Sequence, residues 1–299
     1  MNNLGAARPL ALVGQVAQSE RPAWAQEVLV GDCTPAFSTQ NGVLFRGDCL
    51  DVMKLVKDEA VDTVFADPPF NLNKFYGARV NDNKSDSEYI AWCKLWLNES
   101  VRVLKPGGSL FVYNIPKWNM LLGAYLYEKG LEFRHSVAIS MKAGLPIPRR
   151  LYPCHYSLLY FSKGKPKSFR KIRTPIETCR HCGKEIKDFG GHRDAMNPKG
   201  VNLSDMWLDI SPVRHWKFKS PKRKANQLST KILERVVEIS TSPGDVVLDP
   251  FGGSGTTYAV CESRSRRWIG MEIETLEVII ERLALPAQHR HPNFDYIED

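Results

Sequence analysis

The stretch Val61-Asp62-Thr63-Val64-Phe65-Ala66-Asp67-Pro68-Pro69-Phe70 decides the fold prediction. Its first six residues form a mostly apolar run with the length of a buried strand. A carboxylate, two prolines and an aromatic ring follow, at the end of the strand where an open α/β sheet binds its ligands. Because proline fixes φ and lacks an N–H, we expect a rigid turn whose carbonyls accept hydrogen bonds. We predict that this turn holds an exocyclic amino group, although a plain turn at a strand end fits the same residues.

A second motif extends from Asp245 to Thr257, where an apolar run leads through Asp249 into a glycine-rich turn and then a helix. Glycines let the backbone approach a ligand closely, and the helix that follows directs free N–H groups at the turn. The next predicted strand ends at Glu272, 23 residues after Asp249. That spacing is close to the one at which an acidic residue binds a ribose hydroxyl. This order of elements predicts a site for an adenosine-containing cofactor.

Together, the two motifs resemble those of the DNA amino-methyltransferases, which transfer a methyl group from S-adenosylmethionine to an exocyclic nitrogen of adenine or cytosine. The amino-group motif, Asp67 to Phe70, comes about 180 residues before the cofactor motif, Phe251 to Gly255. That order resembles the circularly permuted beta group of the family, and the resemblance covers roughly residues 42–282. It implies a Rossmann-like α/β fold: a mostly parallel twisted sheet with helices on both faces. It also implies S-adenosyl-L-methionine as cofactor and double-stranded DNA as substrate, with methylation of adenine N6 by base flipping.

The resemblance also implies which residues form the site. The target amino group is expected to bind Asp67, Pro68, Pro69 and Phe70, with Asp67 also beside the cofactor. The cofactor residues it implies are Asp48, Asn226, Leu228, Asp249, Pro250, Phe251, Gly252, Gly253, Ser254, Gly255, Thr256 and Glu272. Asp48 suits the N-cap of a helix equally well. The segment Lys224–Ser229 departs from the His-Pro-Thr-x-Lys-Pro run of many relatives, which affects Asn226 and Leu228.

Positive charge is concentrated between Lys163 and Lys224, which hold 17 Lys or Arg and 6 Asp or Glu, a net +11, so the rest of the +8 chain sums to −3. Cations placed on phosphates release counterions, so we predict a DNA target-recognition region inserted at residues 163–214. A solvated surface insertion is the alternative. The aromatic residues of the block could stack or wedge against bases, but we favour a small core of the insertion formed by some of them: Phe169, Phe189, Trp207, Trp216 and Phe218. The predicted DNA-binding residues are Lys74, Tyr76, Arg79, Arg173, Arg180, Arg193, Arg214, Lys217 and Lys219.

The remaining sequence suits one large α/β domain with an insertion. We assign residues 31–162 and 215–299 to the catalytic domain and residues 1–30 to a poorly ordered leader. Strands are predicted at 42–48, 61–66, 109–113, 133–141, 156–161, 246–249 and 268–271, and helices at 49–55, 87–104, 118–129 and 227–240. No apolar stretch approaches the ~20 residues of a membrane span, and we see no secretory signal. Seven scattered cysteines suit a reducing compartment, here the bacterial cytoplasm or nucleoid. A homodimer and a cognate restriction endonuclease are further partners that the resemblance allows.

Two cysteine motifs indicate other chemistry, and we favour neither. Cys179 and Cys182 have the spacing of a zinc pair, but structural zinc needs four ligands; His192 is a candidate third, and the fourth has to come from a distant residue such as Cys154. We therefore predict no metal and a tight turn with free thiols. Pro153-Cys154 resembles the nucleophile of enzymes that methylate carbon 5 of cytosine. That role is disfavoured because Asp67 already occupies the expected catalytic turn.

Three alternatives to adenine methylation stay open at this point. The first is methylation of cytosine N4, for which Ser-Pro-Pro-Tyr is the usual signature in the family. The second is a methyltransferase that acts on RNA or protein, since related motifs occur there. The third is an inactive DNA-binding protein, which the intact Asp67 and the glycine-rich turn argue against.

Overall fold

The computed structural model describes residues 20–73, 82–140, 148–149, 151–176, 178–179, 181–185, 190–210 and 227–284. Several predicted site residues lie outside these ranges, namely Lys74, Tyr76, Arg79, Arg180, Arg214, Lys217, Lys219 and Asn226, and of Arg193 only the backbone is described. Three aromatic residues of the basic block also lie outside them, namely Phe189, Trp216 and Phe218.

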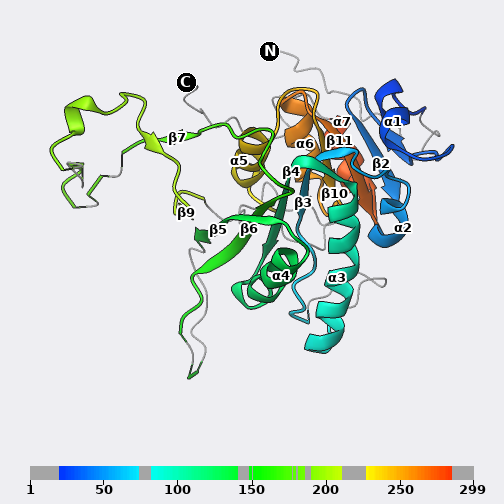
Figure 1. The fold of residues 1–299 in the computed structure, drawn as a ribbon, viewed down its shortest axis with the longest axis horizontal. Helices are drawn as coiled ribbons and strands as arrows, with labels where there is room; N and C mark the ends of the chain where they lie inside the picture. Colours follow the sequence, from blue (N-terminus) through cyan, green and yellow to red (C-terminus); the bar gives the residue numbers. More distant parts are fainter. Residues whose placement is uncertain are drawn as a thin grey trace, which may run out of the picture.

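A nine-stranded sheet with the order β1-β2-β11-β10-β3-β4-β6-β5-β9 forms the centre of the described part of the chain (Figure 1). The strands β2, β11, β10, β3 and β4 are parallel neighbours, and β6 runs antiparallel between β4 and β5. The strands are β1 (Phe37–Ser38), β2 (Gly42–Arg46), β3 (Val61–Ala66), β4 (Leu104–Asn114), β5 (Glu132–Ser140), β6 (His155–Ser162), β9 (Met206–Trp207), β10 (Val246–Asp249) and β11 (Arg267–Glu272). The mostly parallel sheet agrees with the sequence prediction.

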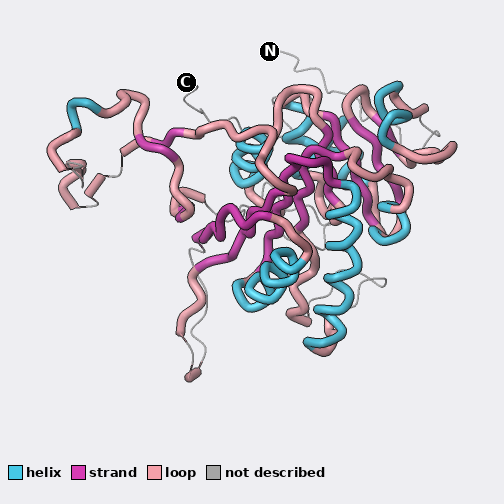
Figure 2. The backbone as a smooth tube through the Cα atoms, viewed as in Figure 1, coloured by secondary structure: helices cyan, strands magenta, loops and turns pink. Residues whose placement is uncertain are grey.

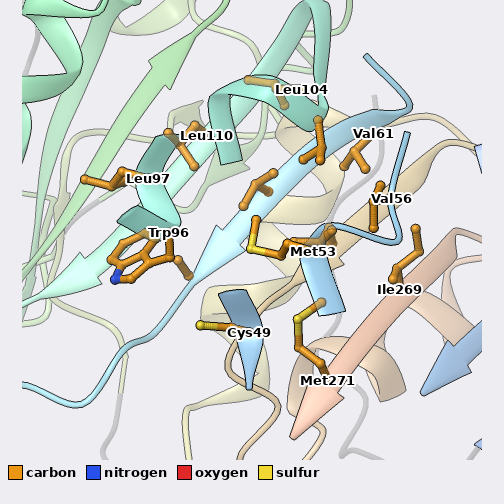
Figure 3. Packing of buried hydrophobic residues seen from close by; sticks show 14 of the residues in the cluster. Cys49, Met53, Val56, Val61, Trp96, Leu97, Leu104, Leu110, Ile269 and Met271 are labelled. Carbon is orange, nitrogen blue, oxygen red and sulfur yellow. The ribbon is translucent and has the colours of Figure 1, made fainter. Parts of the chain in front are cut away.

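Helices cover both faces of this sheet. They are α1 (Ala23–Val28), α2 (Cys49–Met53), α3 (Asp86–Val103), α4 (Pro116–Glu128), α5 (Thr230–Ser240), α6 (Thr256–Ser263) and α7 (Glu277–Ala284). The first four pack in one hydrophobic cluster, which includes Met53, Trp96 and Leu110 (Figure 3). The last three pack in a second cluster. The sheet is therefore the middle of three layers, as the parallel strands with helical crossovers require.

The helix α3 shows how local sequence fixes these elements. Ser85 accepts a hydrogen bond from the N–H of Glu88, and the Glu88 carboxylate accepts one from the N–H of Ser85, which is a capping box. Tyr89 and Trp96 of this helix are buried.

The strand β4 begins directly after this helix, earlier than the predicted strand at residue 109. Its pairing with β3 shifts register between Val61 and Thr63.

The predicted leader at residues 1–30 is too long at its C-terminal end. The helix α1 packs in the first hydrophobic cluster, and Trp24, Ala25 and Val28 are buried. The sequence signal was weak because α1 has only 6 residues, too few to establish a helical period. The ordered domain therefore includes this helix. None of the described helices is long and apolar enough to span a membrane.

Part of the predicted insertion belongs to the main sheet. After Thr174 the described segments reach away from the sheet, mostly as loop, with a small pairing of β7 (Arg173–Thr174) and β8 (Val201–Asn202) (Figures 1 and 2). The chain returns at β9, which pairs with β5. Trp207 is 2% exposed in the second cluster, while Phe169 is 53% exposed. Neither of these two aromatic residues forms a separate core of the insertion.

Candidate active site

The two predicted motifs, far apart in sequence, lie at the ends of adjacent parallel strands. Val64 of β3 pairs with Leu248 of β10, so Asp67 and the turn after Asp249 emerge at the same edge of the sheet. On the other side of β10, β11 pairs with β10 and with β2 in parallel. Glu272 and Asp48, which end or follow these strands, therefore lie at the same edge. This is the edge where open α/β sheets bind ligands.

Two helices fix the Asp-Pro-Pro-Phe turn by its backbone. The hydroxyl of Tyr89 donates to the carbonyl of Pro69 at 2.6 Å. The indole N–H of Trp118 donates to the carbonyl of Phe70 at 2.8 Å. Asp67, which directly follows β3 and precedes the two prolines, is half-buried. The turn is thus held rigidly from α3 and α4, as the two prolines lead one to expect.

The ring of Phe70 lies in a group of three aromatic residues. Its centroid is 5.8 Å from that of Tyr113 and 5.8 Å from that of Tyr156, and these two are 5.3 Å apart. Burial raises the pKa of Tyr113 well above its ordinary value, and the charge of Asp67 adds to this effect. Tyr113 is therefore a neutral hydroxyl near the Asp67 carboxylate. Sequence reasoning treated Tyr113 and Tyr156 only as strand residues; their place at the ends of β4 and β6 was the signal that could have found them.

The glycine-rich turn is built against the end of β11. The N–H of Gly252 donates to the carbonyl of Met271 at 2.9 Å, and the N–H of Gly253 donates to the Glu272 carboxylate at 2.7 Å. A Cβ at position 252 would stand 2.7 Å from that Met271 oxygen, so only glycine fits. Gly253 has φ +51° and an exposed backbone. The conformation therefore needs glycine at both positions, for close packing at the first and for positive φ at the second.

The buried carboxylate of Asp249 hydrogen-bonds to both sides of this turn. Its side chain is 3% exposed, and its two oxygens accept hydrogen bonds from the N–H of Phe251 at 2.9 Å and the hydroxyl of Thr257 at 2.5 Å. Burial, with a smaller contribution from the charge of Glu272, raises the pKa of Asp249 to about 7 against these hydrogen bonds. These two hydrogen bonds hold the turn in shape.

Glu272 and Asp48 lie close together at the ends of β11 and β2. The N–H of Gly47 donates to the Glu272 carbonyl at 3.1 Å. The Asp48 carboxylate accepts from the N–H of Leu50 at 2.8 Å and caps α2, which confirms the N-cap alternative. Burial raises the pKa of Glu272, whereas hydrogen bonds from backbone N–H groups lower it in part. Two carboxylates are thus available beside the glycine-rich turn.

The other predicted cofactor residues support the turn or border it. Phe251 packs against Trp92 and Trp96 of α3, with ring centroids 5.8 and 5.3 Å apart. Pro250, Ser254, Gly255 and Thr256 are buried. Arg282 of α7, a residue that sequence reasoning missed, donates to the Ser254 carbonyl and the Thr256 hydroxyl. These residues fix the conformation of the turn around the exposed Gly253.

Leu228 lies just before α5 and is partly buried against the second cluster. Ser240, at the far end of this helix, hydrogen-bonds with the Thr63 hydroxyl of β3 at 2.9 Å. Thr63 precedes the end of β3, so the C-terminal end of α5 lies away from the sheet edge that carries Asp67. The N-terminal end of α5 therefore lies towards that edge. Leu228 is therefore placed at the edge that carries the site.

Of the predicted DNA-binding residues, Arg173 is described with its side chain. Its guanidinium donates to the Gly200 carbonyl at 3.1 Å across the β7–β8 pair. This contact gives Arg173 a structural role in the β7–β8 pair.

A separate cavity of about 550 Å³ lies beside α4, lined by residues that include Asn119, Tyr127 and Phe133. Its wall side chains Leu159 and Phe161 belong to the first cluster, whereas the Phe70 ring belongs to the second.

The fold and the paired motifs define the class of protein. A model of the N6/N4 DNA methylase family matches residues 61–281, and the chain belongs to this family. Among its relatives, the type II methyltransferase M.BamHI of Bacillus amyloliquefaciens is 57% identical over 255 residues, which are 85% of this chain and 60% of that protein. The type II methyltransferase M.HpaI of Haemophilus parainfluenzae is 31% identical, over 80% of this chain and 73% of the relative. The chain thus spans less than two thirds of the length of M.BamHI.

Solved structures share the fold. The PvuII DNA methyltransferase, described as cytosine-N4-specific, aligns with a TM-score of 0.59 at 22% identity, covering 82% of this chain and 86% of that one. A putative DNA modification methylase of Thermus thermophilus, solved with S-adenosyl-L-methionine, aligns with a TM-score of 0.53 at 19% identity, covering 86% and 98%. These likenesses confirm the predicted Rossmann-like methyltransferase fold.

Proposed function

We propose that this chain transfers a methyl group from S-adenosyl-L-methionine to an exocyclic amino group of a base in duplex DNA. One observation carries the proposal: Asp67 at the end of β3 lies beside the glycine-rich turn at the end of β10. An acceptor for the amino group and a turn suited to a nucleoside cofactor therefore open at one edge. Membership of the DNA methylase family supports the same activity.

The residues beside the turn fit such a cofactor. Gly253 offers an exposed backbone at the turn, and a Cβ added there finds its nearest neighbour only at 3.8 Å. The carboxylates of Asp48 and Glu272 can accept hydrogen bonds from ribose or adenine donors, as acidic residues at this position do in nucleotide-binding folds. Asp67, on the next strand but one from Glu272, offers a negative charge for the cationic end of the cofactor.

The chemistry assigned to the protein is mainly positioning. When bound, S-adenosyl-L-methionine supplies an electrophilic methyl group on a sulfonium. An exocyclic amine is a poor nucleophile because its lone pair is delocalised into the ring. We infer that Asp67 and the Pro68 carbonyl accept its two protons in hydrogen bonds and so favour a pyramidal nitrogen whose lone pair points at the methyl group. Fixed acceptors of this kind also stabilise the positive charge that develops on the amine.

The target base has to leave the duplex to reach this carboxylate, at a cost of a few kcal/mol in unstacking. Phe70 and Tyr156, whose rings lie 5.8 Å apart, are the side chains that we infer to contact the extruded base. Phe70 is 9% exposed, so a small part of its surface is accessible. Base flipping and these contacts rest on the proposed DNA substrate.

For the acceptor we infer adenine N6, because Asp67-Pro68-Pro69-Phe70 resembles the adenine form of the motif. Cytosine N4 is the second candidate, since relatives of both kinds exist. The protein YhdJ of Escherichia coli, named as a DNA adenine methyltransferase, is 27% identical, and the PvuII enzyme is named as cytosine-N4-specific. A cognate restriction endonuclease, a homodimer and a place in the bacterial cytoplasm complete the proposal.

Methyl transfer by the purified chain tests the proposal. The chain is incubated with duplex DNA or structured RNA and isotopically labelled S-adenosyl-L-methionine, and digested nucleosides are identified by mass spectrometry. We expect N6-methyldeoxyadenosine in DNA. The Asp67→Ala variant should lose methyl transfer and retain cofactor affinity within about threefold, while Asp32→Ala, which removes an exposed carboxylate, should act normally.

Each other outcome has a definite meaning in this assay. Full activity of Asp67→Ala contradicts the catalytic assignment. If the product is N4-methyldeoxycytidine and not N6-methyldeoxyadenosine, the acceptor is cytosine N4 and the adenine assignment is wrong. Methylation of RNA but not of DNA contradicts the DNA substrate.

A further inference from the structure

The segment around Cys179 and Cys182 folds into a tight backbone turn. Thr178 and Glu185 form an antiparallel bridge. Inside it, the N–H of Cys179 donates to the Lys184 carbonyl at 2.6 Å, and the N–H of Gly183 donates to the Cys179 carbonyl at 2.9 Å. Gly183 has φ +69°, which lets the chain reverse directly after the second cysteine.

This turn directs N–H groups at a sulfur atom. The backbone N–H groups of Cys182 and His181 and the thiol of Cys182 hydrogen-bond to the Cys179 sulfur. Hydrogen bonds of this kind stabilise a thiolate, the form of cysteine that binds metals. The two thiols also lie within hydrogen-bonding reach of each other, on an exposed surface.

The described part of the surrounding segment has no apolar core of its own. Between residues 171 and 205, Gly200 is the one buried residue among those that the structure describes. The segment is mostly loop and reaches away from the sheet (Figures 1 and 2). Segments that bury so little apolar surface usually depend on a metal or a disulfide for their stability. In a reducing compartment a metal is the available means.

We propose that Cys179 and Cys182 bind a structural zinc ion as two thiolate ligands of a tetrahedral site. The sequence prediction of free thiols rested on ligand count alone; the backbone geometry of the turn is the further observation. Binding forms two Zn–S bonds and releases the two thiol protons to solvent.

Structural zinc takes four ligands. Among the described residues no cluster of three ligating side chains is formed, so the remaining ligands have to join the pair when the ion binds. His192, ten residues after Cys182, has an exposed ligating ring on the same segment.

The metal content of the full chain tests the proposal. The protein is purified under reducing conditions from cells grown with added zinc, and bound metal is measured by inductively coupled plasma mass spectrometry. We expect about one zinc per chain. After exchange for Co²⁺, the spectrum should show the thiolate charge-transfer band and the visible bands of a tetrahedral site. Both Cys179→Ser and Cys182→Ser should bind zinc at least tenfold more weakly, whereas Cys33→Ser should bind normally.

A second measurement on the wild-type chain avoids dependence on variant folding. Removal of zinc with a chelator should speed limited proteolysis between residues 171 and 205, and added zinc should restore protection. The proposal is overturned by a chain purified without zinc that takes up none, by a Co²⁺ spectrum without a thiolate band, or by a Cys179–Cys182 disulfide in the reduced preparation. None of these readouts depends on methyl transfer, so they are separate from the test of the proposed function.

Discussion

Tyr89 of α3 donates a hydrogen bond of 2.6 Å to the carbonyl of Pro69 in the Asp-Pro-Pro-Phe turn. The same hydroxyl accepts a hydrogen bond from the Asn114 side chain at 3.0 Å, at the end of β4. Tyr89 is 2% exposed, so this chain of contacts is buried. One buried hydroxyl thus connects α3, the end of β4 and the turn that carries Asp67.

Replacing Tyr89 with Phe should weaken catalysis more than binding. The change removes the hydroxyl and leaves the Pro69 carbonyl and the Asn114 amide without their partner, at a cost of about 1–3 kcal/mol in stability. Because the turn then positions Asp67 less accurately, we expect kcat to fall about tenfold with a smaller change in KM for DNA. Steady-state kinetics and urea unfolding measure both effects. Tyr125→Phe, which removes an exposed hydroxyl bonded to Asn98, should leave both nearly unchanged; equal kinetics in the two variants would count against a positioning role.

Asp249 should make stability depend on pH. Its folded-state pKa is raised from 3.8 to about 7, chiefly by burial. The folded state therefore binds the proton more tightly than the unfolded state, and the stabilisation present below pH 3.8 is lost as the pH rises towards 7. In Asp249→Asn the neutral amide can keep hydrogen bonds with Phe251 and Thr257, so this loss should disappear. Urea unfolding of both proteins at pH 5 and pH 8, without cofactor, measures the difference. Identical pH dependence in the two proteins would show that Asp249 does not titrate in this range.

Adding a methyl group at Gly252 should disrupt the turn. A Cβ there meets the Met271 carbonyl at 2.7 Å and the Tyr258 hydroxyl at 2.8 Å, and the first of these is backbone that cannot move aside. We expect Gly252→Ala to weaken cofactor binding at least tenfold, as measured by calorimetry. Gly130→Ala is the matched control, since Gly130 has φ +81° and no atom within 4 Å of the added Cβ. It should cost about 1 kcal/mol of stability and keep normal cofactor affinity; normal affinity in Gly252→Ala as well would refute the prediction.

Removing Asp209 should loosen the attachment of β9. Arg235 of α5 is 1% exposed, lies over the Trp207 ring and makes two hydrogen bonds to the Asp209 carboxylate, at 3.0 and 2.6 Å. Burial opposes ionisation of Asp209, but Arg235 and Lys231 outweigh it and lower its pKa to about 2. Asp209→Ala leaves a buried guanidinium without its anion.

We expect a loss of about 2 kcal/mol at pH 7, below the range for fully buried pairs because Asp209 is half-exposed. This loss should shrink as the pH falls from 4 towards 2, since protonation already removes the anion there. Chemical unfolding across this range measures both effects. Asp51→Ala, which breaks an exposed pair with Lys54, should change stability by less than about 1 kcal/mol.

The sequence was sufficient to predict those elements and site residues whose pattern is local. The apolar runs of β3 and β10 and the turns that follow them carry their own signals, so Asp67 and the glycine-rich turn could be placed at strand ends before the structure. It was insufficient where the partner is remote. The strand β9 has two residues and no periodicity, and its place is set by pairing with β5 and by Arg235. The positioning role of Tyr89 likewise depends on a contact with a residue 20 positions away.

The inserted segment between β6 and α5 is attached to the main sheet and its helices near both of its ends. On the first side, Lys167 pairs with Asp62 at 3.2 Å and Arg170 with Glu238 at 2.9 Å. On the second side, β9 and the Asp209–Arg235 pair attach it to β5 and α5. We therefore expect that the chain between these anchors can be shortened, lengthened or replaced by the matching segment of a relative while the strand ends stay in place. If this stretch recognises the DNA target, as its charge led us to predict, such a replacement changes the recognised sequence and leaves the predicted catalytic residues in position.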